Sequence, residues 1–261
     1  MTLAEAVAWM ARLAGAATAV AALELLWVRR ALADDGVFAW PVLRREFAGA
    51  PRVVRVLADV GFGYRGVCAV LAIQLAAGLA LPWFGHPAAA WLAFATTLAV
   101  AIRFRGSYNG GSDAMLLIVT LAIALARTAP DTGVARAGLA YAAVQLVLSY
   151  FVSGTAKLRD PAWRRGTALP ILVALPHYQV SPRAQALLSR PAVSRLAGWA
   201  MLAFECSAPL ALVNATACAA LVIVGAGFHL ANAVVFGLDR FLWTWLAAYP
   251  ALLYWVAQRS A

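Results

Sequence analysis

The chain has 261 residues, of which 64% are hydrophobic and only 12% are charged. Soluble domains contain about 45–50% apolar and about 25% charged residues, so this composition excludes an ordinary water-soluble domain. The length allows several membrane spans of about 20 residues each. We therefore expect an all-α, polytopic integral membrane bundle whose main partner is the lipid bilayer.

The net charge of +10 raises the question of nucleic-acid binding. The arginines, however, fall in the gaps between apolar segments and do not gather on an amphipathic face with aromatic residues between them. That distribution is typical of membrane topology, so we expect no nucleic-acid partner. The three cysteines lie singly in apolar stretches, as do the three histidines, and no metal motif is readable: Cys68, Cys206, Cys218, His86, His177 and His229.

Apolar runs between breakers predict about eight transmembrane helices in a single domain covering residues 1–261. The expected spans are Ala4–Val28, Val67–Leu81, Ala88–Ile102, Ala114–Ala126, Gly138–Ser153, Leu196–Val213, Ala215–Phe236 and Phe241–Ala257. Asn214 alone separates the sixth span from the seventh. The first run resembles a secretory signal, but Arg29 and Arg30 precede the small-residue site, so a retained first span is expected.

Positive charge tests this count, because a missing or extra helix would move every later loop to the opposite side of the membrane. Loops 29–66, 103–113, 154–195 and 237–240 hold 17 of the 21 Lys and Arg residues. The positive-inside rule then places these loops in the cytoplasm and both termini outside. We expect this membrane to be a bacterial inner (cell) membrane. The strong preference for arginine over lysine is typical of a GC-rich genome.

Two of the basic loops contain amphipathic stretches, around Trp40–Leu57 and Pro182–Leu196. Apolar residues and arginines recur there at helical spacing. The pattern predicts interfacial helices that lie on the membrane, with a solvated loop as the alternative.

A glycine-rich turn, residues 103–113, lies between two apolar runs and contains Asn109 and Asp113. Glycines allow close backbone approach, and a helix N-terminus presents free N–H groups to an anion or a polar headgroup. We therefore list both residues as ligand-binding candidates. Alternatively, Ser112 or Asp113 simply caps the helix that follows.

Lys157 is the only lysine among the 21 basic residues. In a chain so biased toward arginine, a lone lysine suggests that an ammonium group is required. A desolvated lysine readily loses its proton and can then act as a general base, whereas arginine stays protonated. The alternative is a lysine that extends toward the membrane interface.

Other polar residues within the expected spans also need an explanation, because such groups are costly in hydrocarbon and often mark a site. His229 and Asn232 share one helix face at i and i+3, where they could bind a ligand or tie helices together. Glu205 lies near the middle of the sixth span. Structural pairing, with Arg12 as one conceivable partner, is an alternative to a proton-relay role.

Two segments together resemble the membrane domain shared by HTTM (horizontally transferred transmembrane) proteins, vitamin K-dependent gamma-carboxylase and SdpB-like proteins. The first has Tyr-Phe, then small-Gly-x-x-Lys-Leu, shortly before a Trp. The second is Phe-His-x-x-Asn, leading into a helix with aromatic residues and a late proline. The matching residues are Tyr150, Phe151, Gly154, Lys157, Leu158, Trp163, Phe228, His229, Asn232, Phe236, Phe241 and Pro250.

The resemblance implies that Lys157 is the base that deprotonates a reduced quinone or vitamin K-like cofactor, with His229 in the same catalytic group. It also implies ligand-binding roles for Tyr150 and Trp163. The carboxylase has an Asn-Asn-His run where this chain has residues 108–113, which lack the histidine. Its large region for protein substrates has no counterpart here, so a peptide substrate is left open. The carboxylase site opens to the lumen, whereas the charge count places Lys157 on the cytoplasmic side.

Two functions follow from these observations, and whether the protein is an enzyme stays open between them. In the first, a quinone-like or other lipid-soluble small molecule binds between the helices, with Lys157 as base. Asn109, Asp113, Tyr150, Trp163, Glu205 and Asn232 would then position its polar groups. In the second, the protein is a non-enzymatic accessory or immunity-type membrane protein whose polar groups only staple helices together.

Overall fold

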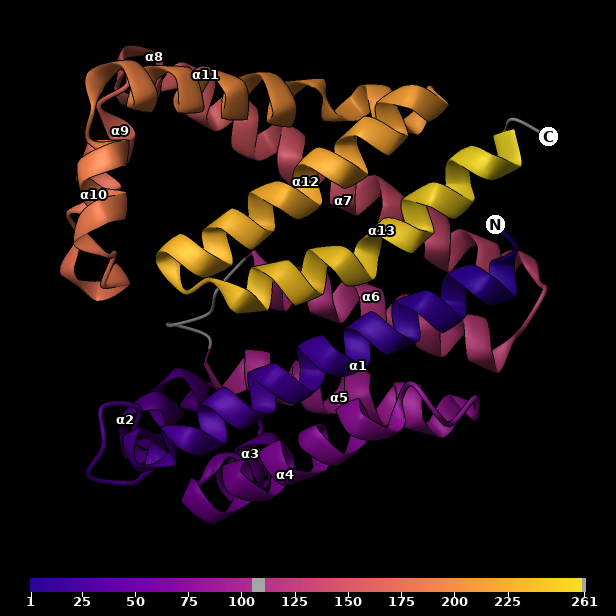
Figure 1. The fold of residues 1–261 in the computed structure, drawn as a ribbon. Helices are drawn as coiled ribbons and strands as arrows, with labels where there is room; N and C mark the ends of the chain where they lie inside the picture. The colour runs from indigo at the N-terminus through magenta and orange to yellow at the C-terminus, as the bar shows by residue number, and fades with distance from the viewer. Residues whose placement is uncertain (105–110, 260–261) are drawn as a thin grey trace.

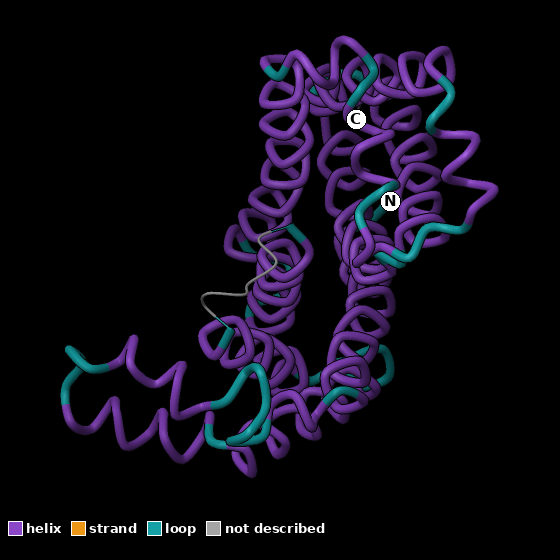
Figure 2. Tube along the Cα trace, turned by 90° about the vertical axis from the view of Figure 1, so that its left-hand side faces the viewer, coloured by secondary structure: helices purple, strands orange, loops and turns teal. Residues whose placement is uncertain are grey.

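The computed structural model describes residues 1–104 and 111–259, and within these ranges every regular element is a helix (Figure 1, Figure 2). The long helices are α1 (Leu3–Trp27), α4 (Tyr64–Ala80), α5 (Pro87–Arg103), α6 (Ser112–Thr128), α7 (Gly133–Arg159), α11 (Pro191–Ser207), α12 (Ala215–Phe236) and α13 (Asp239–Arg259). Shorter elements connect them: η1 (Arg29–Leu32), α2 (Trp40–Leu43), η2 (Arg44–Phe47), α3 (Arg52–Phe62), α8 (Pro161–Arg165), α9 (Ala168–Val173), η3 (Pro176–Tyr178), α10 (Pro182–Leu188) and η4 (Ala208–Leu212).

The all-helical prediction is confirmed, and seven of the eight expected spans each fall on one long helix, whereas the sixth, Leu196–Val213, covers the end of α11 and η4. Within the described ranges, three helices are both long and apolar enough to cross a membrane: α1, α7 and α12. Helices α3 and α4 would add a fourth if they form one span, although they are bent by 70°. The 17-residue helices α5, α6 and α11 extend roughly 25 Å, less than the hydrocarbon core of about 30 Å. The chain is a helical membrane protein, and the count of eight crossings stays a prediction.

The long helices run side by side, with the two termini at one end of the bundle (Figure 1). The connecting elements α2, α9 and α10 lie at the opposite end, together with the turn between α12 and α13 (Figure 1). An even number of passes, as the charges predict, requires both termini at one end of the bundle.

Small residues set how closely the helices approach. Helix α1 packs against α4 and α13, and its buried face consists mainly of alanines. Gly15 and Gly78 face each other across the α1–α4 contact, where a Cβ on Gly15 would lie 2.6 Å from the Gly78 carbonyl oxygen. Close backbone contact of this kind is the usual way in which membrane helices gain packing energy.

Helix boundaries in the second half of the chain follow from local capping. Asn214 is the N-cap of α12, where its side chain accepts a hydrogen bond of 2.9 Å from the Ala217 amide. Gly237 ends the same helix with φ of +69°, a left-handed conformation that favours glycine. Val213 and Asn214 separate α12 from the preceding η4, so the break lies at the position that the sequence suggested.

The two amphipathic stretches, predicted to form interfacial helices, are each divided between several elements. Residues 40–57 form α2, η2 and the start of α3, and residues 182–196 form α10 and the start of α11. Prolines cause the breaks, because Pro51 and Pro191 cannot continue a preceding helix. In α3, several apolar side chains are exposed, Val60 at 72% among them, as expected of a helix in contact with lipid.

Candidate functional site

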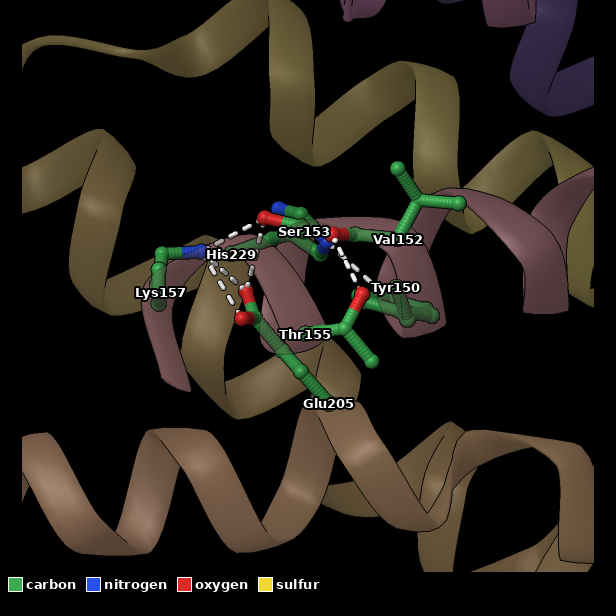
Figure 3. A network of polar contacts seen from close by, with 7 residues as sticks. All are labelled: Tyr150, Val152, Ser153, Thr155, Lys157, Glu205 and His229. Carbon is green, nitrogen blue, oxygen red and sulfur yellow. Dashed lines mark hydrogen bonds and ion pairs between the residues drawn. The ribbon is translucent and has the colours of Figure 1, made fainter. Parts of the chain in front are cut away.

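Lys157 and Glu205 form an ion pair between α7 and α11 (Figure 3). The Lys157 Nζ lies 2.7 Å from each carboxylate oxygen of Glu205 and 2.6 Å from the Ser153 Oγ. Glu205 is only 3% exposed and Lys157 is 19% exposed. The three N–H donors of the ammonium therefore have three acceptors, in surroundings that contain little water.

Helix α7 positions this group because it continues to Arg159, beyond the expected span end at Ser153. Ser153 and Lys157 are one helical turn apart and so lie on the same face. Between them, Gly154 allows α11 to come close, since a Cβ there would lie 2.7 Å from the Glu205 Cβ and 2.9 Å from the Cys206 amide nitrogen. The glycine in the small-Gly-x-x-Lys pattern thus brings the carboxylate within reach of the lysine.

Two expectations about these charges need correction. Lys157 was expected at the start of a loop, and it lies in a helix, because the helical pattern continues past the apolar run. Arg12 was a conceivable partner for Glu205, but its guanidinium lies 4.9 Å from the Trp9 ring centroid on α1. Lysine supplies the counter-charge because α7, and not α1, packs against α11.

A second polar group lies on α7 one to two helical turns before Ser153 and Lys157. The Tyr150 hydroxyl is 2.8 Å from the His229 Nε2 of α12 and 2.8 Å from the Tyr249 hydroxyl of α13. Tyr150 and His229 are each 3% exposed. This chain of hydrogen bonds ties α7, α12 and α13 together near the Lys157 end of α7. Figure 3 draws two of its members, Tyr150 and His229, beside the Lys157 group.

A cavity of about 160 Å³ lies between the two polar groups. Its walls carry Lys157, Glu205, Tyr150, His229, Asn232 and Trp245, with Ser149 and Ser153 and several aromatic and aliphatic side chains. The His229 Nδ1 and the Trp245 Nε1 are buried and have no hydrogen-bond partner in the part of the chain that the structure describes. Buried polar groups are normally paired, so these two nitrogens are polar atoms on residues of the cavity wall that lack a protein partner.

A larger and more open hollow of about 480 Å³ adjoins this cavity. The two share four residues: Ser149, Ser153, Phe241 and Trp245. The remaining wall comes from α6 and α7 and is mostly aliphatic, with Met115, Ile118 and Leu148 among its residues. An apolar molecule could therefore extend from the polar cavity toward the surface between α6, α7 and α13.

Other expected site residues lie at the edges of this region. The Lys157 Nζ is 5.5 Å from the Trp163 ring centroid, and Asn232 lines the cavity. Asp113 does not line it, but lies 3.6 Å from the Arg240 guanidinium. Neither Ser112 nor Asp113 occupies the cap position of α6, because the N-cap is Gly111, and no side-chain cap bond is present there among the described residues. Asn109 lies outside the described residues.

Several residues of the site escaped sequence reasoning. Ser153 had a usable signal, since it lies four residues before Lys157 within the same motif. Tyr249 and Trp245 had none, because α13 is rich in aromatic residues and nothing distinguishes these two. Arg240 contacts Glu24 as well as Asp113 and joins α13 to α1 and α6, which only the tertiary structure reveals.

The geometry suits proton transfer and hydrogen bonding, and the described residues offer no metal-binding group of three or more His, Cys, Asp or Glu side chains. A lysine with a buried carboxylate beside it can exchange a proton with that partner. The hydroxyl group of Tyr150 and the ring nitrogens of His229 supply further donors and acceptors at the opposite wall of the cavity.

Comparison with known proteins gives one positive result. A family model described as the HTTM domain matches residues 120–255, just over half of the chain. This range includes both polar groups and the walls of the smaller cavity. No curated protein and no solved structure matches the chain.

Proposed function

Because the chain belongs to the HTTM domain family, whose model matches residues 120–255, we propose that it binds a quinone-like, lipid-soluble small molecule between its helices. In this proposal Lys157 is the base that takes a proton from a hydroxyl group of the bound molecule. The single observation that carries the proposal is the buried Lys157–Glu205–Ser153 group on the wall of a cavity.

The proton has a defined route in this arrangement. Transfer of one proton from the ammonium to the Glu205 carboxylate leaves a neutral amine beside a carboxylic acid. A low-dielectric environment favours such a neutral pair more than water does. The amine then accepts the proton of a hydroquinone hydroxyl, which leaves an ammonium group and a hydroquinone anion. One O–H bond breaks, one N–H bond forms, and no electron is transferred.

The other polar residues would orient the ligand. His229 and Asn232 lie on the α12 wall of the cavity, one helical turn apart. The Tyr150 hydroxyl is hydrogen-bonded to the Nε2 of His229, so the Nδ1 is the ring nitrogen that would contact a ligand atom. Trp163 covers the lysine from the α8 side and would limit the access of water.

The same proposal includes a topology. We place the protein in a bacterial inner membrane as one domain over residues 1–261, with both termini outside and the basic loops in the cytoplasm. The Lys157 end of α7 then lies on the cytoplasmic side. The arginine-rich connections at that end support this assignment, because basic loops are retained in the cytoplasm.

Lipid extraction tests the binding part. Protein purified from its membrane in mild detergent should carry a lipid-soluble aromatic hydroxyl or quinone compound, which mass spectrometry of the extract identifies. A Ser149→Trp variant fills the junction of both hollows and should lose that compound. Leu98→Trp, on an exposed position of α5, serves as the control and should retain it. Equal extracts from both variants would contradict the proposal.

A second function has its own supporting observation. Both polar groups join helices, since Lys157–Glu205 ties α7 to α11 and Tyr150 ties α7 to α12 and α13. A non-enzymatic accessory or immunity-type protein would need nothing more from them. In that case the Lys157→Arg variant, whose guanidinium can still pair with Glu205, should lose function only to the extent that less of the protein is present in the membrane. The base role requires that function is lost at unchanged abundance.

A further inference from the structure

We propose that the site accepts a molecule with one six-membered ring and an apolar tail, and that Trp245 is the positioning residue that holds an oxygen of the ring. This inference rests on the proposed function and specifies its ligand. Three observations support it: the size of the inner cavity, the unpaired indole nitrogen, and the apolar hollow that continues from the cavity.

The inner cavity limits the headgroup. Its volume of about 160 Å³ is close to that of engineered protein cavities of about 150 Å³ that hold one benzene molecule. A fused two-ring headgroup would extend beyond a cavity of this size, into the outer hollow. Aromatic residues form much of the wall, namely Tyr150, Phe228, Phe241 and Trp245, and suit a flat ring.

Trp245 lies on the boundary of both hollows and is 5% exposed. Its Nε1–H can only donate a hydrogen bond, and it has no acceptor among the described residues. The ring of His229 packs beside it with a centroid distance of 4.9 Å, and the Nδ1 of that ring is also unpaired. A ligand oxygen that accepts a hydrogen bond from the indole N–H would satisfy this buried group.

The outer hollow accounts for the tail. It is about three times larger than the cavity, more open, and lined largely by aliphatic side chains of α6 and α7. Ile118 and Leu148 lie on its wall, and Leu148 is 44% exposed, so the hollow reaches the surface of the bundle. In a bilayer this surface meets lipid chains. A hydrocarbon tail could therefore stay in the membrane while its ring occupies the cavity.

Binding of defined probes to the purified protein tests the inference. Equilibrium dialysis in detergent would compare 2-decyl-1,4-benzoquinone, 2-decyl-1,4-naphthoquinone and 2-methyl-1,4-benzoquinone. The one-ring decyl compound should bind at least about tenfold more tightly than either of the others. Equal or tighter binding of the two-ring compound would overturn the assigned headgroup.

Two variants separate the ring contact from the tail contact. Trp245→Phe removes the N–H and keeps the aromatic ring, and should weaken binding of the decyl benzoquinone about three- to tenfold. Trp83→Phe, at an 84% exposed position, should leave it unchanged. Leu148→Trp should lower the affinity for the decyl compound to that for the methyl compound, whereas Leu92→Trp on α5 should not.

The outcomes distinguish the inference from the proposed function. If no probe binds to the unmodified protein, both fail. If the probes bind but Trp245→Phe and Trp83→Phe have equal affinities, the role of Trp245 is overturned while ligand binding stands. If Leu148→Trp and Leu92→Trp bind the decyl compound equally well, the tail route is overturned.

Discussion

The Lys157 ammonium lies 2.7 Å from both carboxylate oxygens of Glu205, a residue 48 positions further along the chain. Glu205 is almost fully buried, so the lysine is the counter-charge that allows a carboxylate at this depth. Removing one member of a buried pair leaves an uncompensated charge, whereas removing both leaves none. This asymmetry gives the first prediction.

Lys157→Met should lower the free energy of unfolding by about 3 kcal/mol, because it leaves Glu205 buried without its partner. The double variant Lys157→Met/Glu205→Gln should regain most of that loss. Thermal unfolding in detergent measures both. Arg159→Met, on an exposed position of the same helix, is the control for loss of a positive charge. A double variant as unstable as the single one would show that the pair contributes through packing and not through charge.

Gly154→Ala should separate α7 from α11 and lengthen the ion pair. The added methyl group would lie 2.7 Å from the Glu205 Cβ and 2.9 Å from the Cys206 amide nitrogen, neither of which is the end of a flexible side chain. Overpacking of this kind costs about 1–3 kcal/mol. The same substitution at Gly138 meets its nearest atom at 3.5 Å and should be tolerated. Equal unfolding temperatures for the two variants would argue against close contact of α7 and α11.

Gly225→Ala should disturb the hydrogen bonds of Tyr150. A methyl group at this position of α12 would overlap the Tyr249 hydroxyl and lie 3.1 Å from the Tyr150 hydroxyl. We expect a loss of about 1–3 kcal/mol, since buried hydroxyls would lose partners. Gly227→Ala, on the same helix, meets no atom within 4 Å and should be neutral or slightly stabilising. Thermal unfolding of the two variants would show no difference if the hydroxyl pair were absent.

Arg240 should not be replaceable by lysine. Its guanidinium contacts the Glu24 carboxylate, the Ala21 carbonyl oxygen at 3.1 Å and the Asp113 carboxylate at 3.6 Å. The planar fork reaches two helices at once, which a single ammonium cannot do. Arg240→Lys and Arg240→Gln should therefore both lower stability, by about 1–2 kcal/mol. Full stability of the lysine variant would indicate that only the charge of Arg240 matters.

Apolar runs and single capping residues were enough to locate the helices. Seven of the eight expected spans coincide with long helices because hydrophobic patterning and breakers such as Asn214 act locally. The site was only partly predictable. Lys157 and His229 stood out as rare residue types, but their pairing depends on which helices are neighbours. Nothing in the sequence indicates that α7 packs against α11, so the sequence alone could not identify Lys157 as the partner of Glu205.

The most direct test of the central claim is the ultraviolet difference spectrum of bound 2-decyl-1,4-benzoquinol, recorded without oxygen at neutral pH. Ionisation of a phenol shifts its absorption to longer wavelength. The unmodified protein should show the ionised form, because the Lys157 amine accepts the hydroxyl proton. Lys157→Arg keeps the positive charge next to Glu205 but cannot accept a proton, and should bind the quinol in its neutral form. Identical spectra from the two proteins, at equal occupancy, would contradict the role of Lys157 as the base.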